Sequence, residues 1–60
     1  MKNQFEALYI FACGTLMLRE QDLDAAAEVA KALDSPDACV RGVAGYFMNA
    51  ASRMFTPAHA

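Results

Sequence analysis

The sequence predicts an all-α protein with three helices, in which a helical hairpin is followed by a longer third helix. Glycine and proline are scarce, with three and two residues among 60, and such a composition favours helices. Apolar residues recur at intervals of three and four, which is the helical period. A chain of this length forms one small domain. We expect that domain over residues 1–56, with a frayed C-terminal tail at residues 57–60.

The first helix is expected over about residues 3–20. Asn3 can cap it, and Glu6 stands where a capping box places its acid. Its apolar residues form two stripes: Phe5, Leu8, Tyr9, Ala12 and Leu16 in one, and Ile10, Phe11, Gly14, Met17 and Leu18 in the other. An ordinary surface helix has a single apolar stripe. Two stripes predict burial on two sides, so we expect the protein to be oligomeric or bound to a partner.

The second helix is expected over about residues 22–33. Asp22 is a suitable N-cap, and Asp24 lies near the positive end of the helix dipole. The apolar positions follow the helical rhythm, namely Leu23, Ala26, Val29, Ala30 and Leu33. Because most of them are alanine, this helix can approach a neighbour closely but buries little area.

The third helix is expected over about residues 36–55. Ser35 is a suitable N-cap and Pro36 suits the first helical position, with Asp37 in the first turn. Its core stripe comprises Val40, Val43, Ala44, Phe47, Ala51 and Met54. Gly42 and Gly45 interrupt the pattern, which predicts either a close backbone approach or a flexible turn.

Composition and motifs give no support for catalysis, so the protein is not expected to be an enzyme. The single histidine, His59, is the penultimate residue, and Cys13 and Cys39 lack the spacing of metal ligands. We therefore expect no catalytic, cofactor-binding or metal-binding residues and no cofactor. Two isolated cysteines favour reduced thiols in a cytoplasmic protein. The net charge of −2 makes nucleic acid and membranes unlikely partners.

The predicted function is non-enzymatic binding of another protein chain or of a second copy, as a small adaptor, chaperone-like subunit or inhibitor. Large apolar side chains dominate the energetics of protein interfaces. On this basis the candidate partner-binding residues are Phe5, Leu8, Ile10, Phe11, Leu18 and Phe47.

Residues 9–36 resemble a single tetratricopeptide (TPR-like) repeat, a helical hairpin of about 34 residues. The matching positions are Tyr9, Cys13, Leu16, Ala25, Val29, Ala32 and Pro36. Two positions depart from the family, since Glu20 stands in place of glycine and Asp22 in place of an aromatic residue. The resemblance implies binding of a protein or peptide, with the third helix as a cap or as the start of a further unit.

Residues 26–43 resemble a DNA-binding helix-turn-helix, which gives the alternative function of a transcriptional regulator that binds DNA as a dimer. The matching positions are Ala30, Leu33, Val40 and Val43. Asp34 stands where the turn prefers glycine. Among the exposed positions that this resemblance implies for the recognition helix, only Arg41 is well suited to contact a base edge.

Overall fold

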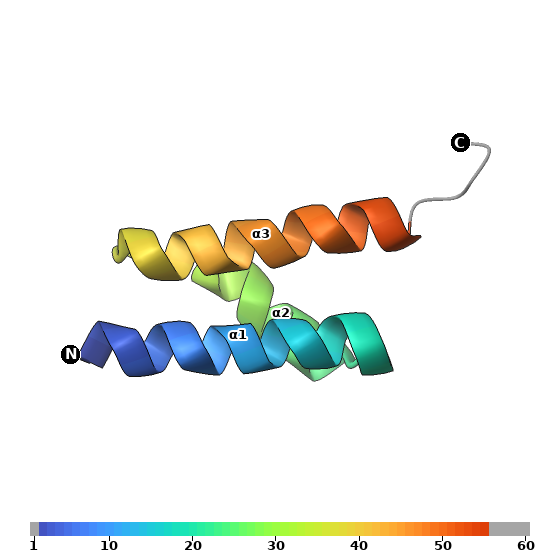
Figure 1. The fold of residues 1–60 in the computed structure, drawn as a ribbon, viewed down its shortest axis with the longest axis horizontal. Coiled ribbons are helices and arrows are strands. Elements are labelled where there is room, and N and C mark those ends of the chain that lie inside the picture. Colours follow the sequence, from blue (N-terminus) through green and yellow to red (C-terminus); the bar gives the residue numbers. More distant parts are fainter. Residues whose placement is uncertain (1, 56–60) are drawn as a thin grey trace.

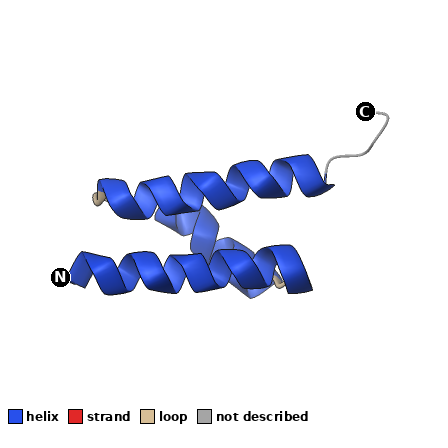
Figure 2. Cartoon of the chain, viewed as in Figure 1, coloured by secondary structure: helices blue, strands red, loops and turns tan. Residues whose placement is uncertain are grey.

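The chain is an all-α protein, as the sequence predicts. The computed structural model describes residues 2–55, and these residues form three helices: α1 (Lys2–Glu20), α2 (Leu23–Ala32) and α3 (Ala38–Phe55). Figure 2 shows helices joined by short connections, with no strand in this part of the chain. The expected tail at residues 57–60 lies outside the described residues.

The three helices follow a zigzag path. In Figure 1, α1 and α3 run in the same direction, and α2 crosses behind them to return the chain. Helix α1 contacts both other helices, and its contact with α3 is the more extensive. The molecule is flat, with principal extents of 43 × 19 × 12 Å. Within the described residues, three helices in a flat arrangement cannot surround one another, so helix surface stays uncovered.

One hydrophobic core joins the three helices. Val29 of α2 and Val40 of α3 are fully buried at its centre. The other buried apolar residues are Ala7, Ile10, Cys13, Met17, Ala25, Ala32, Ala44 and Phe47. Four members of this core are alanine, and alanine removes little apolar area from water. Since hydrophobic stabilisation scales with that area, the core holds the helices close together but stabilises them modestly.

The closest approach between helices is at Gly14 of α1. Gly14 is buried, and a Cβ atom added there would overlap the ring of Phe47. The absent side chain therefore provides the space that the Phe47 ring occupies. In contrast, an added Cβ at Gly42 or Gly45 would meet nothing within 4 Å. These two glycines serve no close approach within this chain, and α3 continues through both.

The predicted cap of α2 is confirmed. Oδ1 of Asp22 accepts a hydrogen bond from the amide of Ala25 at 3.0 Å. In the connection between α1 and α2, the backbone of Gln21 is left-handed, with a φ of 54°. The Gln21 amide donates a hydrogen bond to the carbonyl of Met17 at 3.1 Å. Glycine is the usual residue in such a helix C-terminal turn.

The predicted cap of α3 is wrong. The helix begins at Ala38, two residues later than expected, and Asp37 is its cap. Oδ1 of Asp37 accepts hydrogen bonds from the amides of Cys39 at 2.7 Å and Val40 at 3.2 Å. Oγ of Ser35 instead accepts from the amide of Asp37 at 3.1 Å, so Ser35 shapes the turn that precedes the cap.

Asn3 is likewise not a cap. Helix α1 already includes Lys2, so Asn3 lies within its first turn. An N-cap must precede the first helical residue.

The contact between Gly14 and Phe47 predicts opposite effects for two glycine substitutions. Gly14→Ala should lower the free energy of unfolding by about 1–3 kcal/mol, because the new methyl group overpacks the core. The matched control, Gly42→Ala, should raise it by up to about 1 kcal/mol, because it removes a helix-interior glycine at an open position. Chemical denaturation followed by circular dichroism at one protein concentration measures both. Equal effects of the two substitutions would contradict the close approach.

The cap of α3 gives a second stability prediction. Asp37→Ala should lower the free energy of unfolding by about 1 kcal/mol, because two amides at the start of α3 lose their acceptor. Asp37→Asn should retain most of the stability, because an asparagine side chain can also accept these bonds. The same denaturation measurement applies. A larger loss in Ser35→Ala than in Asp37→Ala would mean that Ser35 has the dominant role.

Candidate interaction surface

Helix α1 presents a row of large apolar side chains to solvent on the side away from the core. We call this row the α1 face; it comprises Phe5, Leu8, Tyr9, Ala12 and Leu16. Phe5 is 72% exposed, Leu8 65% and Leu16 46%. Buried residues such as Ile10 and Met17 point about half a turn away from them, because successive residues of a helix are rotated by about 100°. The α1 face therefore has no covering element in the described part of the chain.

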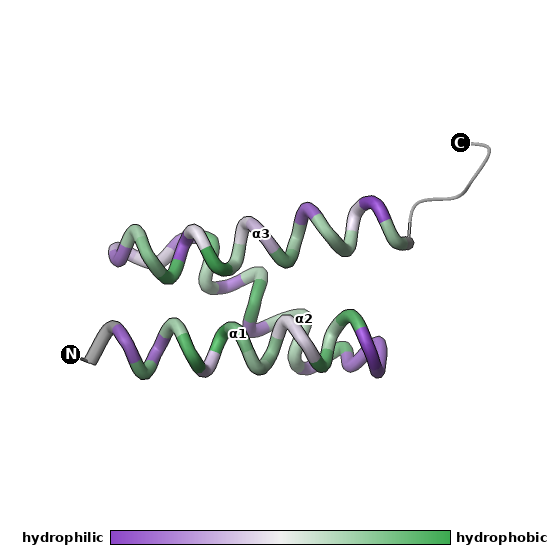
Figure 3. The backbone as a smooth tube through the Cα atoms, in the orientation of Figure 1, coloured by the Kyte–Doolittle hydropathy of each residue, from purple (hydrophilic) through white to green (hydrophobic). Residues whose placement is uncertain are grey.

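This arrangement separates the two apolar stripes of α1. The stripe that contains Phe5, Leu8 and Leu16 is exposed, whereas Ile10 and Met17 of the other stripe are buried. In Figure 3, α1 is coloured as hydrophobic along most of its length. Folding of this single chain therefore covers one side of an apolar helix and leaves the other side in water.

Two of the candidate partner-binding residues lie in the core, and a third is half-buried against it. Ile10 is 4% exposed and Phe47 is 5% exposed, so neither presents a surface to a partner in this structure. Leu18 is half-buried and packs against the same core. Periodicity alone could not separate Ile10 and Leu18 from the exposed positions of α1, because both stripes of this helix consist mostly of apolar residues.

An aromatic cluster lies beside the α1 face. The ring of Phe11 packs edge-on against Phe47, with ring centroids 5.2 Å apart and planes at 85°. Tyr46 makes the same kind of contact with Phe47, at 5.2 Å and 84°. Phe11 is 54% exposed and Tyr46 is 66% exposed. The sequence analysis did not identify Tyr46, although an aromatic side chain next to a core position is the signal that could have found it.

Tyr9 joins the α1 face to a groove between α1 and the end of α2. The groove has a volume of about 360 Å³, and Glu6, Glu28, Lys31 and Asp34 are among the residues that line it. The pKa of the Tyr9 phenol is raised above its ordinary value, first by a hydrogen bond with the Cys13 thiol and then by the charges of Cys13 and Glu28. Its hydroxyl therefore stays protonated and is not an activated base.

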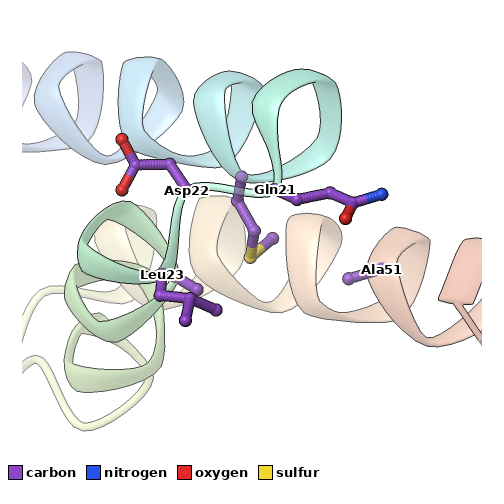
Figure 4. Close-up of a pocket in the computed structure, with 6 residues that line it drawn as sticks. Gln21, Asp22, Leu23 and Ala51 are labelled. Atoms are coloured by element: carbon purple, nitrogen blue, oxygen red, sulfur yellow. The ribbon is translucent and has the colours of Figure 1, made fainter.

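An open apolar cavity of about 410 Å³ lies where the three helices meet. Figure 4 shows Gln21 and Asp22 after the end of α1, Leu23 at the start of α2 and Ala51 on α3. The one ionisable group in its lining, Asp22, already caps α2. The cavity can accept an apolar group but offers no acid–base pair for a reaction.

The two cysteines differ in their exposure to solvent. Cys13 is buried, Cys39 is exposed, and both are free. Within residues 2–55, no group of three or more His, Cys, Asp or Glu side chains could hold a metal ion. His59 lies outside the described residues. None of the helices described is both long and apolar enough to cross a membrane.

Arg41, the candidate DNA contact, is engaged with its own chain. Its Nη1 donates a hydrogen bond to the carbonyl of Ser35 at 2.7 Å, across the turn that precedes α3. Asp37, which caps the helix, lies in the same turn. A carboxylate at this position opposes the approach of phosphate.

The Tyr9 hydroxyl gives a prediction for spectroscopic titration. In a Tyr46→Phe background, Tyr9 should ionise at a pH above the ordinary tyrosine value of about 10. Adding Cys13→Ala should lower the Tyr9 pKa more than adding Glu28→Gln, because the thiol is the larger cause of the shift. Absorbance of the phenolate against pH measures this. An unchanged Tyr9 pKa in Cys13→Ala would exclude the hydrogen bond as its cause.

Comparison of the chain with protein-family models, curated proteins and solved structures finds no significant match. The resemblances to a tetratricopeptide hairpin and to a helix-turn-helix therefore stay predictions from the sequence.

Proposed function

We propose that this chain is a small non-enzymatic interaction protein, such as an adaptor, a chaperone-like subunit or an inhibitor, which binds another polypeptide through the α1 face. The observation that carries the proposal is the exposure of Phe5, Leu8 and Leu16 in one row opposite the core. A reducing, cytoplasmic location belongs to the same proposal and is supported by the free thiols of Cys13 and Cys39.

The size of the exposed row supports this function. A fully buried aromatic side chain removes about 150–250 Å² from water. Phe5 and Tyr9 of this row and Phe11 beside it are each more than half exposed, so together they leave on the order of 300 Å² for a partner to cover. Contiguous apolar patches of about 300–600 Å² are often functional on monomeric proteins. Covering this area would contribute roughly 7 kcal/mol before the entropic cost of association is subtracted.

The structure also identifies which side chains can test the proposal cleanly. Phe11→Asp would remove a contact to the buried Phe47 ring and so would weaken the fold as well as the surface. Leu8 is 65% exposed and does not belong to the buried core. Leu8 is therefore the better position for a test of binding.

A photoreactive amino acid at position 8 should form covalent adducts with the partner in living cells. The matched control carries the same amino acid in place of Leu23, which is 82% exposed at the start of α2. We expect adducts from position 8 and few from position 23, as detected by mass spectrometry of the purified chain. Equal labelling from both positions would contradict the role of the α1 face.

A further inference from the structure

We propose that the polypeptide covering the α1 face is a second copy of this chain, with the two α1 helices antiparallel and crossing at Ala12. This inference rests on the proposed function, because it names the partner of the same surface. It commits to a symmetric dimer, in which the same residues of both copies meet.

Three residues of the α1 face, Leu8, Ala12 and Leu16, are spaced symmetrically about Ala12. Leu8 and Leu16 each lie four residues from Ala12, on opposite sides. Phe5 and Arg19 each lie seven residues from it, which is about two helical turns. In an antiparallel pair with its twofold axis at Ala12, residues at equal distances on either side meet each other. Leu8 then packs against Leu16 of the second copy, and Phe5 lies opposite its Arg19.

The side chains at these positions suit one another. Ala12 is exposed and small, so the two helices can approach closely where they cross. The twofold axis repeats the contact between Leu8 of one copy and Leu16 of the other, and both side chains of each pair are apolar. Arg19 is exposed, and its guanidinium can lie over the ring of Phe5, which is 72% exposed. Such a cation–π contact is favourable for arginine.

Charge distinguishes the antiparallel pair from a parallel one. The α1 face carries no charged residue between Phe5 and Leu16, so two copies meet there without repulsion. The antiparallel arrangement holds the two Arg19 side chains about 21 Å apart along the helix axis. A parallel arrangement would bring them together, and like charges in contact oppose association. Charge therefore favours the antiparallel pair.

The available area is sufficient for a small dimer. With the two leucines, Phe5, Tyr9, Ala12 and Arg19, each copy can contribute on the order of 500 Å². The total of about 1,000 Å² reaches the lower limit for a specific interface. A dimer of this size should dissociate on dilution, so its formation is measurable.

Sedimentation equilibrium over a wide concentration range tests the dimer, with circular dichroism on the same samples to follow the fold. We expect a monomer–dimer equilibrium for the native sequence. Leu8→Asp should weaken the dimer at least tenfold, because it places a charge opposite Leu16 of the other copy. The matched control Leu23→Asp should dimerise like the native chain. A chain that stays monomeric at every concentration would overturn the inference.

Cross-linking tests the antiparallel register. The background is Cys39→Ser, which removes the exposed native thiol. Leu8→Cys and Leu16→Cys are prepared separately and treated with a short bismaleimide, alone and as a mixture. We expect cross-linked dimers chiefly in the mixture, because identical positions lie about 12 Å apart along the axis. Efficient cross-linking of each variant alone would indicate a parallel pair and overturn the register.

The two proposals fail in distinguishable ways. Photo-adducts at position 8 with a different protein, together with a monomeric purified chain, would overturn self-pairing and leave the interaction function standing. A monomeric chain without adducts at position 8 would overturn both. Adducts with twice the mass of this chain would support both.

Discussion

The fold depends on the contact between the Phe47 ring and Gly14. The ring occupies the place where a side chain on α1 would lie, so α3 can approach the α1 backbone closely. This contact also fixes how α1 is rotated about its own axis. With Gly14 turned toward α3, Ile10 and Met17 lie in the core, and Phe5, Leu8 and Leu16 are turned to solvent. The same interaction that closes the core therefore creates the exposed apolar row.

The small number of helices explains why this row has no cover among the described residues. Helix α2 has only ten residues, and it packs with α3 against the one side of α1 that contains Gly14. Covering the opposite side would need a fourth element, and the described residues supply none. Covering the exposed leucines and aromatic rings with a second surface removes them from water and lowers the free energy of the system. In a short chain with a small, alanine-rich core, that decrease in free energy is large relative to the stability of the core itself.

Local rules predicted much of the fold, because helix period and capping chemistry act over a few residues. They identified three helices and the Asp22 cap correctly. They predicted Ser35 as the cap of α3, whereas Asp37 caps it, because serine and aspartate are both common capping residues. The left-handed backbone conformation of Gln21 was not predicted, because glycine is the residue that usually indicates such a position. The rotation of α1 about its own axis could not be predicted from the sequence either, because it follows from the contact between Gly14 and Phe47, which lie far apart in the chain. For that reason Phe5 and Ile10 received the same prediction, although one is exposed and the other is buried.

Stability and association are coupled in such a molecule. Phe11 lies between the α1 face and Phe47, so a partner that covers the α1 face also restricts a ring that contacts the core. A partner that binds only the folded chain stabilises it in proportion to the logarithm of partner concentration. Exposed residues such as Leu8 can then influence unfolding without any contact to the core. A partner that covers the α1 face would therefore also raise the free energy of unfolding of this chain.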